Sequence, residues 1–273
     1  MNIVFIHRGY HLYLQINLKR LKYLFKNANI ILLGDEENEH LKKKLNINFD
    51  YIYNYQKNDD YNYYHLSVNT YDYEKFCVDR WFILRNYMIH NNVNDCFYFD
   101  SDVFVLSAEL KNYMYNLEYD AVAVGKNVIV PTPIFFKLNG LLSLCDNIKE
   151  LYTGDIKEKL LNIVSIYNSY QNGQPHISDM FFLHYFLVYS NMIENVFILN
   201  SDHDSNDYII NTNVRNLFNK RFEFSQKNRH HNVNKKKVLS LHLQGNAKQL
   251  HEKLSKFVYM NKSFYLINEN TIH

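Results

Sequence analysis

The sequence is poor in glycine, and the glycines it has are scattered. Seven glycines occur among 273 residues, and none of them forms a Gly-x-Gly-x-x-Gly or P-loop pattern. Those patterns bring backbone N–H groups close to the phosphates of a nucleotide. If this chain binds a nucleotide phosphate, a metal ion and cationic side chains must take the place of a glycine-rich cradle.

Cysteine, net charge and long apolar runs are also scarce. The three cysteines are Cys77, Cys96 and Cys145, and their sparse, unpaired spacing favours a reducing compartment. A net charge of +2 argues against nucleic-acid binding by bulk electrostatics. The longest apolar stretch, 180–189, is too short to span a bilayer, and the first residues show a strand pattern without a basic leader. We expect a soluble, cytoplasmic protein with no nucleic-acid partner and no integral membrane segment.

Strand and helix patterns alternate through the first part of the chain. Such βαβαβ alternation within about fifty residues is typical of a parallel, nucleotide-binding sheet. Later segments predict a mixed arrangement, and the tyrosine-rich stretch 55–73 predicts a mobile surface loop, with an aromatic face for a sugar as the alternative. Strands are expected at 3–7, 29–33, 49–53, 96–99, 103–106, 120–124, 196–199 and 237–241, and helices at 12–26, 36–45, 73–90, 139–151, 156–170 and 177–189.

Two carboxylates, Asp100 and Asp102, stand between two apolar runs. Side chains at i and i+2 on extended backbone point the same way, so both acids face one point at the end of a strand. Converging oxygen ligands suit a hard divalent cation such as Mg²⁺ or Mn²⁺. Roughly one Asp-x-Asp is expected by chance, and a second, Asp202-His203-Asp204, lies in a polar context that predicts a solvated loop. The strand context therefore singles out the first pair.

Three segments occur in an order that resembles a known family. They are the helix pattern 76–85, the acidic motif 98–103, and the segment 241–248 with the pattern His-x-x-Gly-x-x-Lys. Together they resemble the GT-A type nucleotide-sugar glycosyltransferases, and the last segment resembles glycosyltransferase family 8. The resemblance implies one α/β GT-A domain over 1–273, with a nucleotide-sugar-binding half at 1–106 and an acceptor-side half at 107–273.

The resemblance also implies a metal and diphosphate site. Asp100, Asp102 and His242 would hold a divalent cation, and the imidazole favours Mn²⁺ over Mg²⁺. Gly245 would let the backbone approach the diphosphate, and Lys248 would bind it as a point charge. The alternative for His242 is a structural role at the end of a strand.

Further residues are expected around the donor. Arg80 best matches a family arginine that contacts the donor or a metal-site carboxylate, with Arg85 second; an ion pair with Asp79 or Glu74 is the alternative. His7, Arg8 and Tyr10 follow the first strand, and Ser101 lies inside the acidic motif. Tyr10 would stack on the nucleobase, or else pack at the rim.

Asp179 is the expected catalytic acid on the acceptor side. It opens a predicted helix, whose N-terminus would keep the carboxylate ionised. In an inverting enzyme Asp179 would deprotonate the acceptor hydroxyl, and in a retaining enzyme it would orient the donor sugar. Helix capping is the alternative without a catalytic role.

The sequence departs from family 8 in two places. Gln249-Leu250 replaces the usual Pro-Trp, and the segment 131–136 stands where an Asn-Ala/Ser-Gly segment is usual. Inversion and retention therefore both stay open.

The predicted function is metal-dependent transfer of a sugar from a nucleotide diphosphate donor, with UDP favoured, to a glycan or another hydroxyl acceptor. The alternatives are a sugar-nucleotide nucleotidyltransferase, which normally opens with a glycine-rich loop, and a non-catalytic carbohydrate-binding protein. The abundance of Asn, Lys, Ile and Tyr is typical of an AT-rich bacterial or viral genome.

Overall fold

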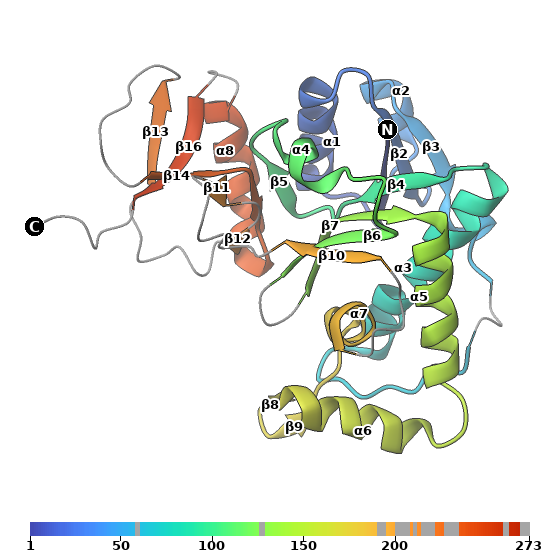
Figure 1. Ribbon diagram of the computed structural model, residues 1–273. Coiled ribbons are helices and arrows are strands. Elements are labelled where there is room, and N and C mark those ends of the chain that lie inside the picture. Colours follow the sequence, from blue (N-terminus) through green and yellow to red (C-terminus); the bar gives the residue numbers. More distant parts are fainter. Residues whose placement is uncertain are drawn as a thin grey trace, which may run out of the picture.

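A seven-stranded mixed sheet forms the centre of the protein (Figure 1). The computed structural model describes residues 1–57, 61–125, 129–189, 195–199, 208–209, 212–213, 222–226, 235–258 and 262–267. The strand order is β10-β6-β7-β4-β1-β2-β3; β7 runs antiparallel to both of its neighbours and the other pairs are parallel. The strands are β1 (Asn2–Ile6), β2 (Asn29–Gly34), β3 (Asn48–Tyr51), β4 (Asp95–Tyr98), β6 (Ala121–Gly125), β7 (Ile129–Lys137) and β10 (Val196–Leu199).

Helices cover both faces of this sheet (Figure 1). Because strand side chains alternate, β1 places Val4 and Ile6 in one core with α3, α5 and α7, and Ile3 and Phe5 in a second core with α1 and α4. Within the described residues, no helix is both long and apolar enough to cross a bilayer. The helices are α1 (Leu12–Leu24), α2 (His40–Leu45), α3 (Tyr71–His90), α4 (Leu110–Met114), α5 (Leu138–Leu151), α6 (Ile156–Tyr167), α7 (Asp179–His184) and α8 (Leu250–Val258), with short helical turns η1 (Ile52–Asn54), η2 (Tyr185–Tyr189) and η4 (Gly245–Gln249).

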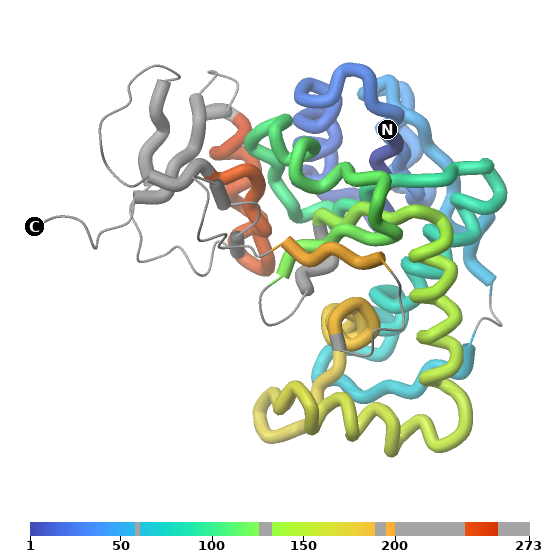
Figure 2. The backbone as a smooth tube through the Cα atoms, in the orientation of Figure 1, coloured from blue at the N-terminus to red at the C-terminus, as the bar shows by residue number. Residues whose placement is uncertain are grey.

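A small second sheet connects the acidic motif to the C-terminal part of the chain. Its strand order is β12-β15-β5, where β5 is Val103–Val105, β12 is Thr212–Asn213 and β15 is Ser240–His242. Helix α8 lies beside α1, although the two come from opposite ends of the sequence (Figure 2). The two predicted halves are thus joined at the acidic motif, and the division at residue 106 stays a prediction. The remaining strands are β8 (Tyr170–Gln171) paired with β9 (Gln174–Pro175), and β11 (Tyr208–Ile209), β14 (Lys235–Val238), β16 (Lys262–Ile267) and β13 (Phe222–Gln226) in one sheet.

The structure confirms the parallel βαβαβ beginning and the mixed second half, and it corrects several details. The helix predicted at 36–45 begins only at His40, and the one predicted at 177–189 is α7 followed by the π-helical turn η2. Strand β7 was not predicted, because Pro131 and Pro133 lack the N–H that a central strand normally uses. The second acidic pair, 202–204, lies outside the described residues.

In the described part of the tyrosine-rich segment, residues 55–57 and 61–70 form a loop, as predicted, but Tyr61 and Tyr63 pack against the protein. The mobility of this loop stays a prediction. Tyr61 stacks on Phe82 at 4.9 Å between ring centroids, and its hydroxyl donates to Asp79 Oδ1 at 2.9 Å. Tyr63 also packs on the core beside α3. Aromatic rings in a polar segment can fill gaps over a helix as readily as they can face solvent.

Candidate active site

The acidic motif forms the turn between β4 and β5. The expectation that alternation on extended backbone aligns Asp100 and Asp102 is therefore wrong, and the turn brings the two carboxylates together instead. Strand β4 ends at Tyr98, and the Val103 N–H closes the turn by donating to the Asp100 carbonyl at 3.1 Å. Because β4 and β1 are parallel, the acidic motif and the segment after β1 leave the sheet at the same edge. Ligands of α/β sheets bind at the carboxyl ends of parallel strands, so this edge is where a nucleotide is expected.

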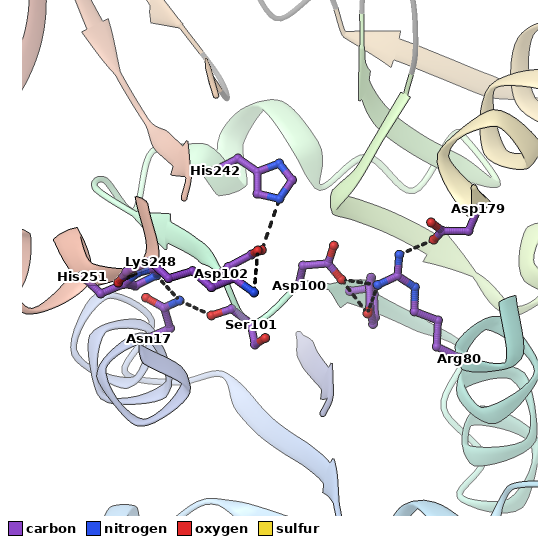
Figure 3. Close-up of polar contacts among 10 residues, drawn as sticks. Asn17, Arg80, Asp100, Ser101, Asp102, Asp179, His242, Lys248 and His251 are labelled. Carbon is purple, nitrogen blue, oxygen red and sulfur yellow. Dashed lines mark hydrogen bonds and ion pairs between the residues drawn. The ribbon is translucent and has the colours of Figure 1, made fainter. Parts of the chain in front are cut away.

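Strand pairing brings His242 to the acidic motif. In the antiparallel pair β5–β15, Val103 stands opposite His242, and the Leu243 N–H donates to the Asp102 carbonyl at 2.9 Å. His242 Nε2 lies 3.2 Å from Asp102 Oδ1, and the ring is almost fully buried. One ligand atom from each of Asp100, Asp102 and His242 lies within 4.8 Å of the other two (Figure 3).

This donor set fits a divalent cation. Metal–ligand distances of about 2.0–2.3 Å place the ligand atoms of one ion roughly 3–4.5 Å apart. Two carboxylates and one imidazole suit the harder first-row ions. His242 Nδ1 is buried and has no hydrogen-bond partner in the described part of the chain, so the contact of its Nε2 with Asp102 orients the ring.

Lys248 adds a cation on the other side of Asp102. Its Nζ lies 3.5 Å from Asp102 Oδ2 and 4.9 Å from the centre of the Tyr13 ring. Burial acts to lower the Lys248 pKa, but Asp102 and Tyr13 raise it above the ordinary value. Burial likewise acts to raise the Asp102 pKa, but the hydrogen bond from His242 and the charge of Lys248 hold it below its ordinary value. Asp102 is therefore kept ionised, as a metal ligand must be.

Arg80 joins Asp100 to Asp179 in a buried ion-pair chain (Figure 3). Its Nη1 lies 2.5 Å from Asp100 Oδ1, its Nη2 donates to Asp179 Oδ2, and the Tyr98 hydroxyl donates to Asp100 Oδ1 at 2.9 Å. Burial raises the pKa of Asp100 to about 6 against the opposing charge of Arg80. Among the described residues, Arg80 forms an ion pair with neither of the alternatives, Asp79 and Glu74. Asp79 pairs with Lys75 at 2.7 Å, and Glu74 accepts a hydrogen bond from the Asn69 side chain.

Arg85, the second candidate arginine, lies elsewhere. Its guanidinium is 5.0 Å from the centre of the Phe82 ring and donates to the Asn86 side chain. Sequence analysis missed Tyr98, although a tyrosine two residues before Asp100 on an otherwise apolar strand shares the face of that acid.

Asp179 is the first residue of α7, and Ser178 occupies the capping position without a side-chain cap bond. The expectation that the helix N-terminus keeps Asp179 ionised is incomplete: burial raises the pKa of Asp179, Arg80 is the largest influence that lowers it, and the Met180 N–H at the helix N-terminus also lowers it. The carboxylate is 4% exposed and bound to Arg80. Its role in catalysis stays a prediction.

The segment after β1 carries the expected donor residues. His7 is buried at the end of β1, with its Nε2 3.0 Å from His11 Nδ1. Arg8 donates to Gln56 Oε1 at 3.1 Å and lies 4.0 Å from the centre of the Phe76 ring. Tyr10 is 38% exposed, its hydroxyl donates to Gln15 Oε1 at 3.1 Å, and its ring lies 5.0 Å from the His40 ring between centroids. Whether these residues bind a donor stays a prediction.

We expect the buried His7 to lower the free energy of unfolding of the protein at mildly acidic pH. Burial, with His11 and Lys248 nearby, lowers its pKa from 6.5 to about 4, so the unfolded chain takes up the proton first as the pH falls. The folded state therefore has its full free energy of unfolding above the unfolded-state pKa of 6.5, and this free energy falls as the pH drops towards 4. Between pH 7.5 and 5 the stability difference between wild type and His7→Asn should shrink by roughly 2 kcal/mol in urea unfolding. His40→Asn, at an exposed position, is the control; equal slopes for all three proteins would contradict the assignment.

Comparisons with known proteins give a structural match only. No protein-family model and no curated protein sequence matches the chain. An active-site mutant of LgtC superposes with a TM-score of 0.51 at 13% identity, over 96% of both chains. The galactosyltransferase LgtC with donor and acceptor sugar analogues gives 0.48 at 15% identity, covering 95% of this chain and 96% of that one. Mouse xyloside xylosyltransferase 1 gives 0.49 at 10% identity, covering 90% and 98%. The mixed seven-stranded sheet and the match to the LgtC mutant confirm the predicted architecture: the chain has the fold of the GT-A glycosyltransferases.

Proposed function

We propose that the protein is a metal-dependent glycosyltransferase that uses a nucleotide diphosphate sugar, with UDP as the nucleotide, and a glycan or another hydroxyl acceptor. The observation that carries the proposal is the convergence of Asp100, Asp102, His242 and Lys248 at one edge of a GT-A sheet. Separate parts of the sequence supply these residues, and only the fold brings them together. A purely structural cluster would not need two acids, an imidazole and a lysine at that edge.

The chemistry of sugar transfer needs this combination. Breaking the bond to the nucleotide leaves negative charge on a diphosphate, which a divalent cation held by Asp100, Asp102 and His242 would stabilise as a Lewis acid. The imidazole favours Mn²⁺ over Mg²⁺. Lys248 would supply a second positive charge. Gly245 has a φ of +56°, a conformation that favours glycine, and its missing side chain would leave room for the diphosphate.

The remaining candidates would surround the donor. Ser101 lies within the acidic motif, and His7, Arg8 and Tyr10 follow β1 at the same sheet edge. Arg80 would orient Asp100 through their ion pair. Asp179, which pairs with Arg80 on the side away from Asp100, would either take the acceptor proton or orient the donor sugar. The cytoplasmic location expected from three unpaired cysteines stays a prediction.

The two alternative functions fit the structure less well. A nucleotidyltransferase needs free backbone N–H groups after the first strand, but the Gly9 N–H donates to Asp35 Oδ2 at 2.6 Å. A carbohydrate-binding protein would present the tyrosine-rich segment to solvent, but only part of it is available: Tyr64, Tyr71 and Tyr73 are exposed, whereas Tyr61 and Tyr63 pack on the core. A carbohydrate-binding protein would also not need the metal ligands and Lys248 together.

Release of UDP from a panel of UDP-sugars tests the proposed function. The purified protein with Mn²⁺ should release UDP from one donor faster than from the others, and a chelator should stop the reaction. Incubation with nucleoside triphosphates and sugar phosphates is the parallel assay. Pyrophosphate release there, without UDP release from any donor, would favour the nucleotidyltransferase.

Lys248→Ala should raise the donor KM and lower kcat, because the lysine would bind charge that grows in the transition state. Loss of a charge-assisted hydrogen bond should cost about 1.5–3 kcal/mol in kcat/KM. Lys253→Ala, on the same helical region but at an exposed position, is the matched control. Unchanged kinetics for Lys248→Ala would make the C-terminal motif a structural turn.

A further inference from the structure

A buried pair of polar side chains connects the acidic motif to the C-terminal motif. Asn17 on α1 and His251 on α8 are each 1% exposed. Asn17 Nδ2 lies 2.5 Å from the Ser101 carbonyl oxygen and 3.0 Å from His251 Nε2. His251 Nδ1 lies 3.0 Å from the Lys248 carbonyl oxygen. Three hydrogen bonds therefore run in series from Ser101 to Lys248 (Figure 3).

The chemistry of the groups fixes the direction of each bond. The Ser101 carbonyl can only accept, so Asn17 must present its NH₂ group there, and its second hydrogen points at His251 Nε2. That nitrogen must then be an unprotonated acceptor, which leaves Nδ1–H to donate to the Lys248 carbonyl. Burial lowers the His251 pKa to about 4, consistent with a neutral ring.

Both carbonyls belong to residues of the candidate site. The Ser101 carbonyl lies in the peptide that leads into Asp102, so its hydrogen bond fixes the backbone orientation of a metal ligand. The Lys248 carbonyl fixes the turn that carries the proposed diphosphate lysine. The His251 ring also packs against Tyr13 and Phe104, at 5.5 and 5.8 Å between centroids, which restricts its rotation.

A purely packing role would not require these residue types. Two apolar side chains would fill the space between α1 and α8 without the cost of burying polar groups. The hydrogen bonds instead make the position of one motif depend on the position of the other. Among the contacts described above, no other pair of side chains links the Ser101 carbonyl to the Lys248 carbonyl.

We propose that Asn17 and His251 are positioning residues, which hold Asp102 and Lys248 at the separation that a cation and a diphosphate require. This role rests on the proposed function for its purpose, but the mechanical connection can be measured without any ligand. The two readouts therefore separate failure of the connection from failure of the proposed function.

The test uses Asn17→Leu, which keeps the approximate shape, and His251→Phe, which keeps the ring and removes both hydrogen bonds. Asn86→Leu is the matched control, because Asn86 is also buried and donates to a backbone carbonyl, that of Tyr55 at 2.7 Å, away from the site. His251→Gln, a milder change, provides the same test where the phenylalanine variant does not fold. Amide hydrogen exchange of the peptides covering 99–106 and 243–252 is measured without ligand, and binding of UDP with Mn²⁺ is measured by calorimetry.

We expect each of the Asn17 and His251 variants to speed exchange in both peptides and to weaken UDP–Mn²⁺ binding at least tenfold. The control should leave both readouts near the wild-type values at a comparable loss of Tm. Faster exchange only in the peptide nearest each substitution, or UDP–Mn²⁺ affinity equal to that of the control, would overturn the proposal. Absence of UDP–Mn²⁺ binding by the wild type would instead refute the proposed function, and the exchange data would still decide whether the connection exists.

Discussion

Asp102→Asn should abolish sugar transfer and weaken nucleotide binding mainly when metal is present. Asp102 is the acid that contacts both His242 and Lys248, and the substitution removes an anionic ligand from a site with few others. Asparagine keeps the shape of the side chain, so the loss would come from charge rather than packing. Isothermal titration with UDP, with and without Mn²⁺, separates the metal-dependent part of the affinity.

Asp79→Asn is the matched control for that experiment. Asp79 is buried and paired with Lys75 at 2.7 Å, but its carboxylate belongs to the α3 surface under Tyr61 rather than to the metal cluster. The control should bind UDP–Mn²⁺ as wild type does. Near-normal turnover of Asp102→Asn with Mn²⁺ would remove the metal hypothesis.

Asp179→Asn should reduce transfer greatly while leaving donor and metal binding almost intact. Asparagine keeps the shape of the side chain but cannot take a proton, and a general base is worth roughly a hundred- to ten-thousand-fold in rate. A loss of that size in kcat, with UDP–Mn²⁺ affinity unchanged, would favour an inverting mechanism with Asp179 as the base.

The ion pair between Arg80 and Asp179 gives this variant a second informative outcome. If Asp179 serves mainly to hold Arg80 against Asp100, the substitution should weaken UDP–Mn²⁺ binding together with kcat. A loss of less than about tenfold in both quantities would contradict a catalytic role. NMR of the anomeric linkage in the product would then decide between inversion and retention.

The sequence predicted the elements that carry many apolar residues. Strands β1 and β2 are continuous apolar runs and helix α3 is buried over most of its length, and the structure places all three within a few residues of the prediction. Strand β7 was not predicted because Pro131 and Pro133 interrupt the pattern of a strand. Its neighbours β4 and β6 supply the tertiary context that overrides this local preference. The packed position of Tyr61 escaped for a similar reason, since a tyrosine beside polar residues gives no sign of the helix it covers.

The candidate site was predictable where its residues lie in compact motifs. Asp100 and Asp102 are two residues apart in the turn that follows β4, and the spacing of His242 and Lys248 carries its own pattern. Contacts that depend on how helices pack were not predictable: the pairing of Arg80 with Asp179 needs α3 beside α7, and the bond between Asn17 and His251 needs α1 beside α8. The two residues of each pair are far apart in the sequence, and neither one indicates which residue it will contact in the folded protein.

Coupled binding of Mn²⁺ and UDP would show that one site holds both the cation and the diphosphate. Calorimetric titration of the wild-type protein with UDP, first with a chelator and then with Mn²⁺, measures whether the cation and the diphosphate share that site. We expect UDP affinity at least tenfold higher with Mn²⁺, and loss of that gain in Asp102→Asn. Equal UDP affinity with and without Mn²⁺, or no UDP binding in either condition, would contradict this expectation.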